Sequence, residues 1–132
     1  MRFSYEAILV PSTDGQYSME VPSLPGCISQ GDNLQHSIEM ITEAASIWIL
    51  DELESGRPIP KPRATTEDDL RHFDNPIVRT IEVDIDSFAK KHASPEMVVR
   101  SFEIPIWLDT IAAQNHLNLP ETLQTAIMQS VR

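Results

Sequence analysis

The sequence predicts an α+β protein with two parts along its 132 residues. Apolar residues alternate with polar ones in short segments near the N-terminus and again at residues 77–86, which is typical of strands. One long segment, at about residues 33–55, instead repeats apolar residues every three or four positions, which is typical of a helix. After about residue 97 the pattern changes to a strand and two short helices. We therefore expect a β-β-β-α-β domain at residues 1–90 and a second domain at residues 97–132.

The first three strands are expected to form a hairpin followed by a return strand. Residues 2–10 and 17–21 alternate, and the Pro, Asp and Gly between them favour a turn. The stretch PSLPG at residues 22–26 contains two prolines, which cannot donate to a sheet ladder, and Gly26, which tolerates positive φ. It predicts a tight corner, after which residues 27–31 form a short third strand.

Residues 33–55 are expected to form one helix that packs on this sheet. Asp32 or Asn33 caps its N-terminus, and Gly56 with the prolines that follow ends it. Its main apolar stripe consists of Leu34, Ile38, Ile41, Ala45, Trp48 and Ile49. A second apolar line of Met40, Ala44, Ile47 and Leu50 runs beside the stripe. More of the helix circumference is therefore expected to be buried than one sheet face can cover.

The charged, proline-containing residues 57–76 indicate a loop, with one helical turn at residues 66–73. Residues 77–86 alternate cleanly and predict a fourth strand that joins the sheet. Residues 88–96 then connect this strand to the C-terminal part.

The C-terminal part is expected to form a strand, a helix that begins near Pro105, a break at residues 115–121, and a final helix through Val131. Such a unit of about thirty-five residues buries too little apolar surface to be stable alone, so we expect it to dimerise.

Charge and composition exclude several classes of protein. The net charge of −10 argues against a nucleic-acid binder with a broad basic face. Residues 1–96 carry 8 basic and 17 acidic side chains, whereas residues 97–132 carry 2 and 3. The acidic first part fits either a basic protein partner or a solubilising surface. No apolar run approaches the roughly 20 residues of a membrane span, and the N-terminus lacks the pattern of a signal peptide.

The cysteine and histidines do not indicate a reactive or metal site. A single cysteine cannot form an internal disulfide, which fits a cytoplasmic location. Cys27 has no adjacent His or basic residue that would lower its pKa, so we interpret it as a small buried hydrophobe. The four histidines, His36, His72, His92 and His116, lack metal-ligand spacing. We expect neither a metal nor another cofactor.

One enzymatic interpretation rests on the predicted fourth strand. Glu82, Asp84 and Asp86 share one face of it and could together bind magnesium. Catalysis of that kind needs acidic groups from several elements, however, and the first strand offers only Glu6. We therefore expect a solvated face and no enzymatic activity.

The order of these motifs resembles the HicB antitoxin family. The hairpin, the Leu-Pro-Gly-Cys corner, the Gly-Asp-x-Leu start of the helix and its end before Ile-Pro are similar to the family's N-terminal domain. The stretches IEVDIDSFAKKH and FEIPIWLDTIAAQNHLNLPETLQTAI are similar to its remaining strand and its ribbon-helix-helix tail. Each motif alone is weak, but six of them in register over nearly the whole chain are specific.

The resemblance implies a partial ribonuclease-H-like domain at residues 1–90 and a ribbon-helix-helix domain at residues 97–132. Proteins of this family bind HicA, a small basic toxin that cleaves messenger RNA, and repress their own operon. The implied partners are therefore a HicA-like toxin, operator DNA and a second copy of the chain, with no membrane partner. Whether dimers pair further into tetramers is left open.

The candidate functional residues fall into three sets. The acidic residues Glu39, Glu43 and Glu54 of the long helix are candidates for contact with the basic toxin. In a ribbon-helix-helix dimer, alternate side chains of two paired strands enter the DNA major groove. Counting back from Pro105, these DNA-facing residues are Val99, Ser101 and Glu103, with Arg100 able to reach the phosphates. The expected dimer core consists of Phe102, Ile104, Trp107, Leu108, Leu123 and Ile127.

The sequence departs from the family pattern at the start of the last helix. The family often has Ser there, where backbone N–H groups bind phosphate, but this chain has Pro120 and Glu121, whose carboxylate competes with phosphate. The alternative function is a stand-alone ribbon-helix-helix transcriptional regulator with a vestigial or ligand-sensing N-terminal domain. A neighbouring gene for a small basic protein with one essential His would favour the antitoxin.

Overall fold

The computed structural model describes residues 1–131, which separate into two compact units. The first unit comprises Arg2–Ala93, and the second begins at Ser94. Among the helices of residues 1–131, none has the length and apolar character that crossing a membrane requires.

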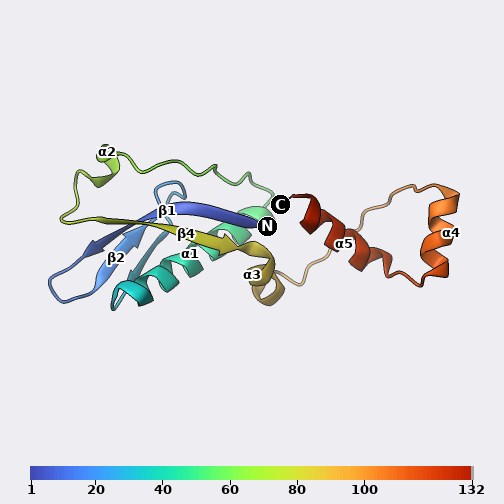
Figure 1. Cartoon of the computed structure of the whole chain (residues 1–132), viewed down its shortest axis with the longest axis horizontal. Coiled ribbons are helices and arrows are strands. Elements are labelled where there is room, and N and C mark those ends of the chain that lie inside the picture. The colour runs from blue at the N-terminus through green and yellow to red at the C-terminus, as the bar shows by residue number, and fades with distance from the viewer. Residues whose placement is uncertain (132) are drawn as a thin grey trace. The chain divides into compact units, whose positions relative to one another are not determined.

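The first unit contains a four-stranded antiparallel sheet in the order β3-β2-β1-β4 (Figure 1). Its strands are β1 (Arg2–Pro11), β2 (Tyr17–Glu20), β3 (Ile28–Gly31) and β4 (Ile77–Asp84). Tyr5 lies opposite Ile81, and Leu9 lies opposite Met19 on one side and Ile77 on the other. The predicted hairpin, return strand and fourth strand are therefore confirmed.

Helix α1 (Leu34–Glu54) covers one face of this sheet (Figure 1). Asn33 caps its N-terminus: the Asn33 side chain accepts a hydrogen bond from the backbone N–H of His36 at 2.9 Å. The core lies between helix and sheet and contains Tyr5, Ala7, Leu9, Met19, Ile41, Ala45, Ile49, Ile81 and Val83. Of the main apolar stripe predicted for this helix, Ile41, Ala45 and Ile49 are buried as expected, whereas Leu34, Ile38 and Trp48 are only half-buried.

The corner between β2 and β3 is a tight turn closed by its own backbone. The N–H of Cys27 donates to the carbonyl of Leu24 at 2.9 Å, and Gly26 has φ of 82°. Pro at the second and Gly at the third position are typical of a type II turn. Cys27 is only 4% exposed, which confirms its interpretation as a buried hydrophobe.

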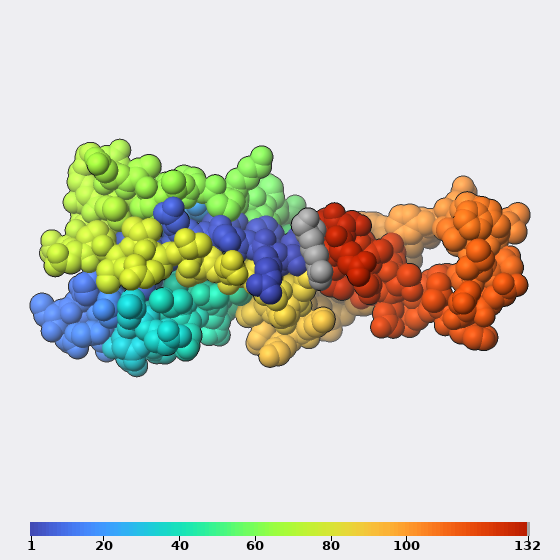
Figure 2. Space-filling model, in the orientation of Figure 1, coloured from blue at the N-terminus to red at the C-terminus, as the bar shows by residue number. Residues whose placement is uncertain are grey.

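The segment at residues 57–76 lies over the sheet on the side opposite α1 (Figures 1 and 2). Thr65 anchors it by donating its backbone N–H to the Glu6 carboxylate at 3.1 Å. At its start, the carbonyl of Pro60 accepts a hydrogen bond from the Tyr5 hydroxyl at 2.7 Å. It contains one short helix, α2 (Glu67–Leu70), where the sequence predicted a helical turn.

Helix α3 (Ile85–His92) was not predicted, and the expectation of a strand through residue 86 was wrong. β4 ends at Asp84 because the side chain of Asp84 caps α3, accepting from the backbone N–H of Ser87 at 3.3 Å. Basic residues in the last turn, Lys90, Lys91 and His92, favour the same helix through its dipole. α3 packs beside α1 and covers part of the second apolar line: Leu50 is 8% exposed, whereas Ile47 remains 54% exposed.

The second unit contains α4 (Ile106–Gln114) and α5 (Leu119–Ser130), as predicted. Residues 93–105 contain neither helix nor strand, so the strand expected before Pro105 is not formed in the single chain. A strand needs a hydrogen-bonding neighbour, and the prediction placed that neighbour in a second copy of the chain.

Candidate functional site

The acidic candidates Glu39, Glu43 and Glu54 are all exposed on α1. Their spacing places them along one side of the helix, together with Ile47. The side-chain amide of Gln35 donates to Glu39 at 3.2 Å. The structure brings Glu43 and Glu54 to the rim of one groove, whereas Glu39 does not line it.

This groove, which we call the α1–α3 groove, has a volume of about 230 Å³. It is lined by Glu43, Ile47, Leu50, Asp51, Glu54, Phe88 and His92. The rings of Phe88 and His92 contact each other in a tilted arrangement, with their centroids 4.5 Å apart. The apolar wall formed by Phe88 was not predicted because α3 was not predicted, although the helix-capping pattern from Asp84 to Ser87 is present in the sequence.

Arg57 neutralises part of the acidic surface at the end of α1. Its guanidinium donates to the carboxylate of Glu52 at 2.9 Å and to that of Asp51 at 3.3 Å. These contacts raise the pKa of Arg57, chiefly through Glu52. The carboxylate of Asp51 at the groove rim therefore already has a cationic partner.

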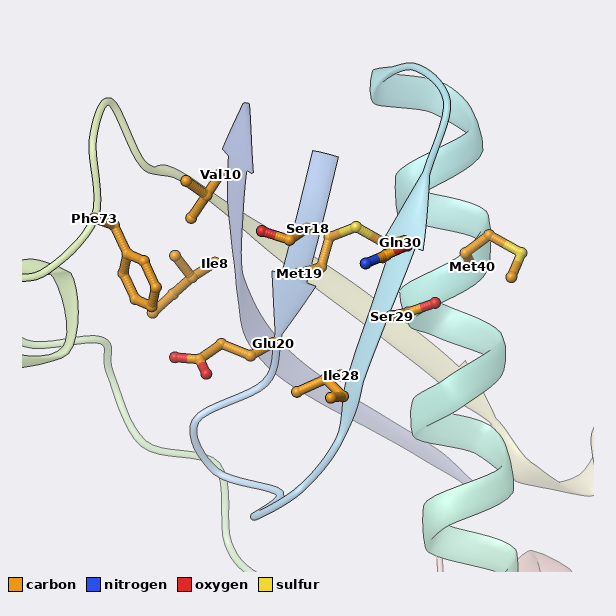
Figure 3. Close-up of a pocket in the computed structure, with 10 residues that line it drawn as sticks. All are labelled: Ile8, Val10, Ser18, Met19, Glu20, Ile28, Ser29, Gln30, Met40 and Phe73. Atoms are coloured by element: carbon orange, nitrogen blue, oxygen red, sulfur yellow. The ribbon is translucent and has the colours of Figure 1, made fainter. Parts of the chain in front are cut away.

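A second groove, which we call the open-face groove, has a volume of about 530 Å³. It lies on the side of the sheet opposite α1 and extends to the β3 edge (Figure 3). In Figure 3 the ring of Phe73 lies against Ile8, while Ile28 lies away from that ring, on β3. Ile8 is fully buried, but Ile28 is 68% exposed, so the groove is a shallow surface. Among the described residues that line this groove, Glu20 alone has an ionisable side chain. Such a lining suits binding better than acid–base catalysis.

The carboxylates considered for a nuclease do not form one face. Glu82 and Asp84 lie 3.5 and 3.8 Å from the guanidinium of Arg2, and Asp86 belongs to α3. Hydrogen bonds from the backbone N–H and hydroxyl of Ser87 lower the pKa of Asp84, in keeping with its role as a helix cap. Within residues 1–131, no three His, Cys, Asp or Glu side chains are grouped to hold a metal ion.

Cys27 lacks the surroundings of a reactive thiol. Burial raises its pKa from 9.0 to about 11, so the thiolate is scarce at neutral pH.

The predicted DNA-facing residues Val99, Arg100, Ser101 and Glu103 are all exposed in a segment without regular structure. Burial does not distinguish them from the expected core residues before Pro105, because Phe102 and Ile104 are 69% and 46% exposed. At the start of α5, the backbone N–H of Glu121 donates to the side chain of Asn118 at 3.1 Å. One N–H group that could bind phosphate at this terminus is therefore already occupied.

The helical residues of the expected dimer core are also exposed in the single chain. Exposure is 65% for Trp107, 40% for Leu108, 44% for Leu123 and 54% for Ile127. Ala112 is the one apolar side chain of residues 94–131 that is buried. The second unit therefore lacks an apolar core of its own within the part of the chain that is described.

Comparison with known proteins identifies the family. Residues 5–127 match the family described as HicB_like antitoxin of bacterial toxin-antitoxin system. Since this match spans far more than half of the 132 residues, the chain belongs to the HicB-like antitoxin family.

Individual proteins are similar to parts of this chain or to nearly all of it. The UPF0150 protein ssr1765 of Synechocystis sp. is 37% identical over 59 residues, which are 45% of this chain and 75% of that protein. A toxin-antitoxin complex from Streptococcus pneumoniae contains a similar fold, with a TM-score of 0.61, 21% identity and coverage of 98% of this chain and 99% of that chain. The HicA3 and HicB3 toxin-antitoxin complex matches with a TM-score of 0.52, 20% identity and coverage of 62% of this chain and 99% of that chain.

Proposed function

We propose that this protein is an antitoxin that binds a HicA-like, RNA-cleaving toxin through residues 1–90 and represses its own operon through residues 97–132. The observation that carries the proposal is the family match over residues 5–127. The likeness to chains of two toxin-antitoxin complexes supports a toxin as the partner.

The charge of the first unit supports a basic partner. The exposed carboxylates of Glu39, Glu43 and Glu54 lie along one side of α1, where they can meet a cationic protein surface. Complementary charge of this kind increases the association rate and selects the partner. Toxin contact on α1 leaves the second unit available for a different role.

The apolar exposure of the second unit supports dimerisation. Contiguous exposed apolar surface marks an interaction site in soluble proteins, and a second copy would cover Phe102, Trp107 and Leu123. Pairing of the two segments before Pro105 would also create the ribbon that the single chain lacks, and with it a surface for operator DNA.

Isothermal calorimetry of the full chain with the HicA-like protein encoded beside its gene tests the toxin contact. A Glu39→Lys/Glu43→Lys/Glu54→Lys variant should bind at least about tenfold more weakly, since it places like charges against a basic partner. Glu67→Lys/Asp74→Lys, which reverses exposed charges outside α1, is the control and should bind like the wild type. No binding by the wild type would refute the antitoxin function.

The open-face groove favours a second candidate, a regulator whose first unit senses a small molecule. Its volume of about 530 Å³ is in the range of ligand sites. Such sites bury most of their ligand, however, whereas Ile28 at this groove is 68% exposed. Operator binding that responds to metabolites and does not respond to the toxin would favour this candidate.

A further inference from the structure

The α1–α3 groove combines an apolar floor with an acidic rim. Leu50 is nearly buried at its base, the Phe88 ring forms the opposite wall, and Ile47 is 54% exposed beside them. Figures 1 and 2 show α3 next to the C-terminal half of α1, both within the first unit. An exposed isoleucine flanked by an aromatic ring is a surface that a partner can cover favourably.

The rim restricts what can occupy this groove. The carboxylates of Glu43, Asp51 and Glu54 border it, and Asp51 is already paired with Arg57 at 3.3 Å. A purely apolar side chain would remove water from the rim carboxylates without replacing their hydrogen bonds, which is costly. An acidic side chain would be repelled by them.

A long cationic side chain satisfies both parts of the groove. The aliphatic stem of Arg or Lys can pack on Ile47 and Phe88 while its charged end stays at the acidic rim. A guanidinium can also stack on the aromatic ring and bind a carboxylate through two N–H groups. We propose that the α1–α3 groove receives an arginine or lysine side chain of the toxin, with Ile47 and Phe88 as its apolar contacts and Glu43 as its ionic contact. This inference rests on the proposed function, and it assigns to Ile47 and Phe88 a role that charge alone does not give them.

The first experiment measures binding of full-length variants to the HicA-like protein encoded beside the gene, by calorimetry. Ile47→Ser removes the apolar contact and should weaken binding about tenfold, as expected for an anchor residue at an interface. Ile28→Ser is the matched control, because it makes the same change at an exposed isoleucine in the other groove and should leave affinity unchanged. Both residues are more than half exposed, so both variants should fold, as far-ultraviolet circular dichroism would verify.

Two results separate this inference from the proposed function. If the wild type binds the toxin and Ile47→Ser binds it equally well, the groove is not the contact, although the antitoxin function stands. If the wild type does not bind, the antitoxin function and the inference both fall.

A second experiment identifies the occupant. Double-mutant cycles combine Glu43→Gln with an alanine substitution of each exposed toxin residue in turn, and the same cycles with Glu39→Gln are the control. Coupling of Glu43 to one Arg or Lys, stronger than the coupling of Glu39, supports the proposal. Coupling only to apolar residues, or equal coupling of both glutamates to every toxin cation, overturns it.

Discussion

A Cβ atom on Gly31 would lie 2.2 Å from the side-chain oxygen of Ser37 and 2.6 Å from its Cα atom. Gly31 is the last residue of β3, and Ser37 lies in the first turns of α1, fully buried. The Ser37 hydroxyl donates to the carbonyl of Asn33 at 2.6 Å, which fixes it against the strand. The glycine before the helix is therefore required because strand and helix approach so closely there.

Gly31→Ala should destabilise the first unit by about 1–3 kcal/mol, because the added methyl group must displace the backbone of α1. Urea unfolding followed by circular dichroism measures this change. The matched control is Gln30→Ala, at the exposed neighbouring position, which should shift stability by less than about 0.5 kcal/mol. Equal unfolding midpoints for the two variants would show that the close approach is absent in solution.

Tyr5→Phe should remove about 1 kcal/mol of stability, since it deletes the hydrogen bond from the buried hydroxyl to the carbonyl of Pro60. Burial raises the pKa of Tyr5 above its ordinary value of 10.0. The folded state thus favours the protonated phenol, and this stabilisation is present below pH 10.0 and lost as the pH rises through the folded value.

Urea titrations of wild type and Tyr5→Phe near neutral pH and above the tyrosine range test both parts of this prediction. The difference in unfolding free energy between the two proteins should shrink at the higher pH. A difference that stays constant would mean that Tyr5 does not titrate differently in the two states.

Cys27 should resist alkylation in the folded protein. A rise of its pKa from 9.0 to about 11 reduces the thiolate fraction at neutral pH about a hundredfold, and burial limits access further. Iodoacetamide labelling followed by mass spectrometry gives the rate without ambiguity, because the chain has 1 cysteine. Similar rates with and without urea would contradict the buried position.

Most of the first unit could be predicted because its signals are local. The alternation in β1, the turn residues around Gly26 and the cap at Asn33 each determine structure within a few residues. α3 escaped prediction because Ile81, Val83 and Ile85 continue the strand alternation one residue past the point where Asp84 caps the helix. Capping and alternation disagreed there, and the capping signal was the correct one.

The candidate site could be predicted only in part. Glu43 is visible in the sequence as an acidic residue on a helix, but its neighbour across the groove, Phe88, comes from a helix that was not predicted. Periodicity alone could not establish whether residues before Pro105 form a strand, since the pairing of that strand depends on a second chain. Local patterns specify elements, whereas grooves and ribbons depend on which elements meet.

Trp107→Ala should lower the fraction of dimer without changing the stability of the first unit. Trp107 is 65% exposed in the single chain, so the loss of about 3–5 kcal/mol expected for truncating a buried Trp should appear only where a second copy covers it. Light scattering at low micromolar concentration measures the mass. Val99→Ala, at an exposed residue expected to face DNA, is the control, and a wild-type mass for Trp107→Ala would count against the predicted dimer core.

Operator binding can be tested at Glu103, which the predicted ribbon places in the major groove. Its carboxylate repels phosphate unless it accepts a hydrogen bond from a cytosine amino group. Glu103→Gln should therefore either tighten binding to every sequence, if the repulsion dominates, or selectively weaken binding to the operator, if Glu103 contacts a cytosine. Mobility-shift titrations with the promoter of its own operon and an unrelated duplex of equal length distinguish these results.

Two neighbouring substitutions complete the same DNA test. Ser101→Ala should cost about 1 kcal/mol, a typical net value for one neutral hydrogen bond. Arg100→Ala should reduce the salt dependence of binding by about one phosphate contact, measured at two salt concentrations. If the wild type binds and none of the substitutions at positions 100, 101 and 103 changes affinity, the DNA surface lies elsewhere. If the wild type binds no DNA at all, the second unit serves only to dimerise, in keeping with the occupied N–H group of Glu121 at the start of α5.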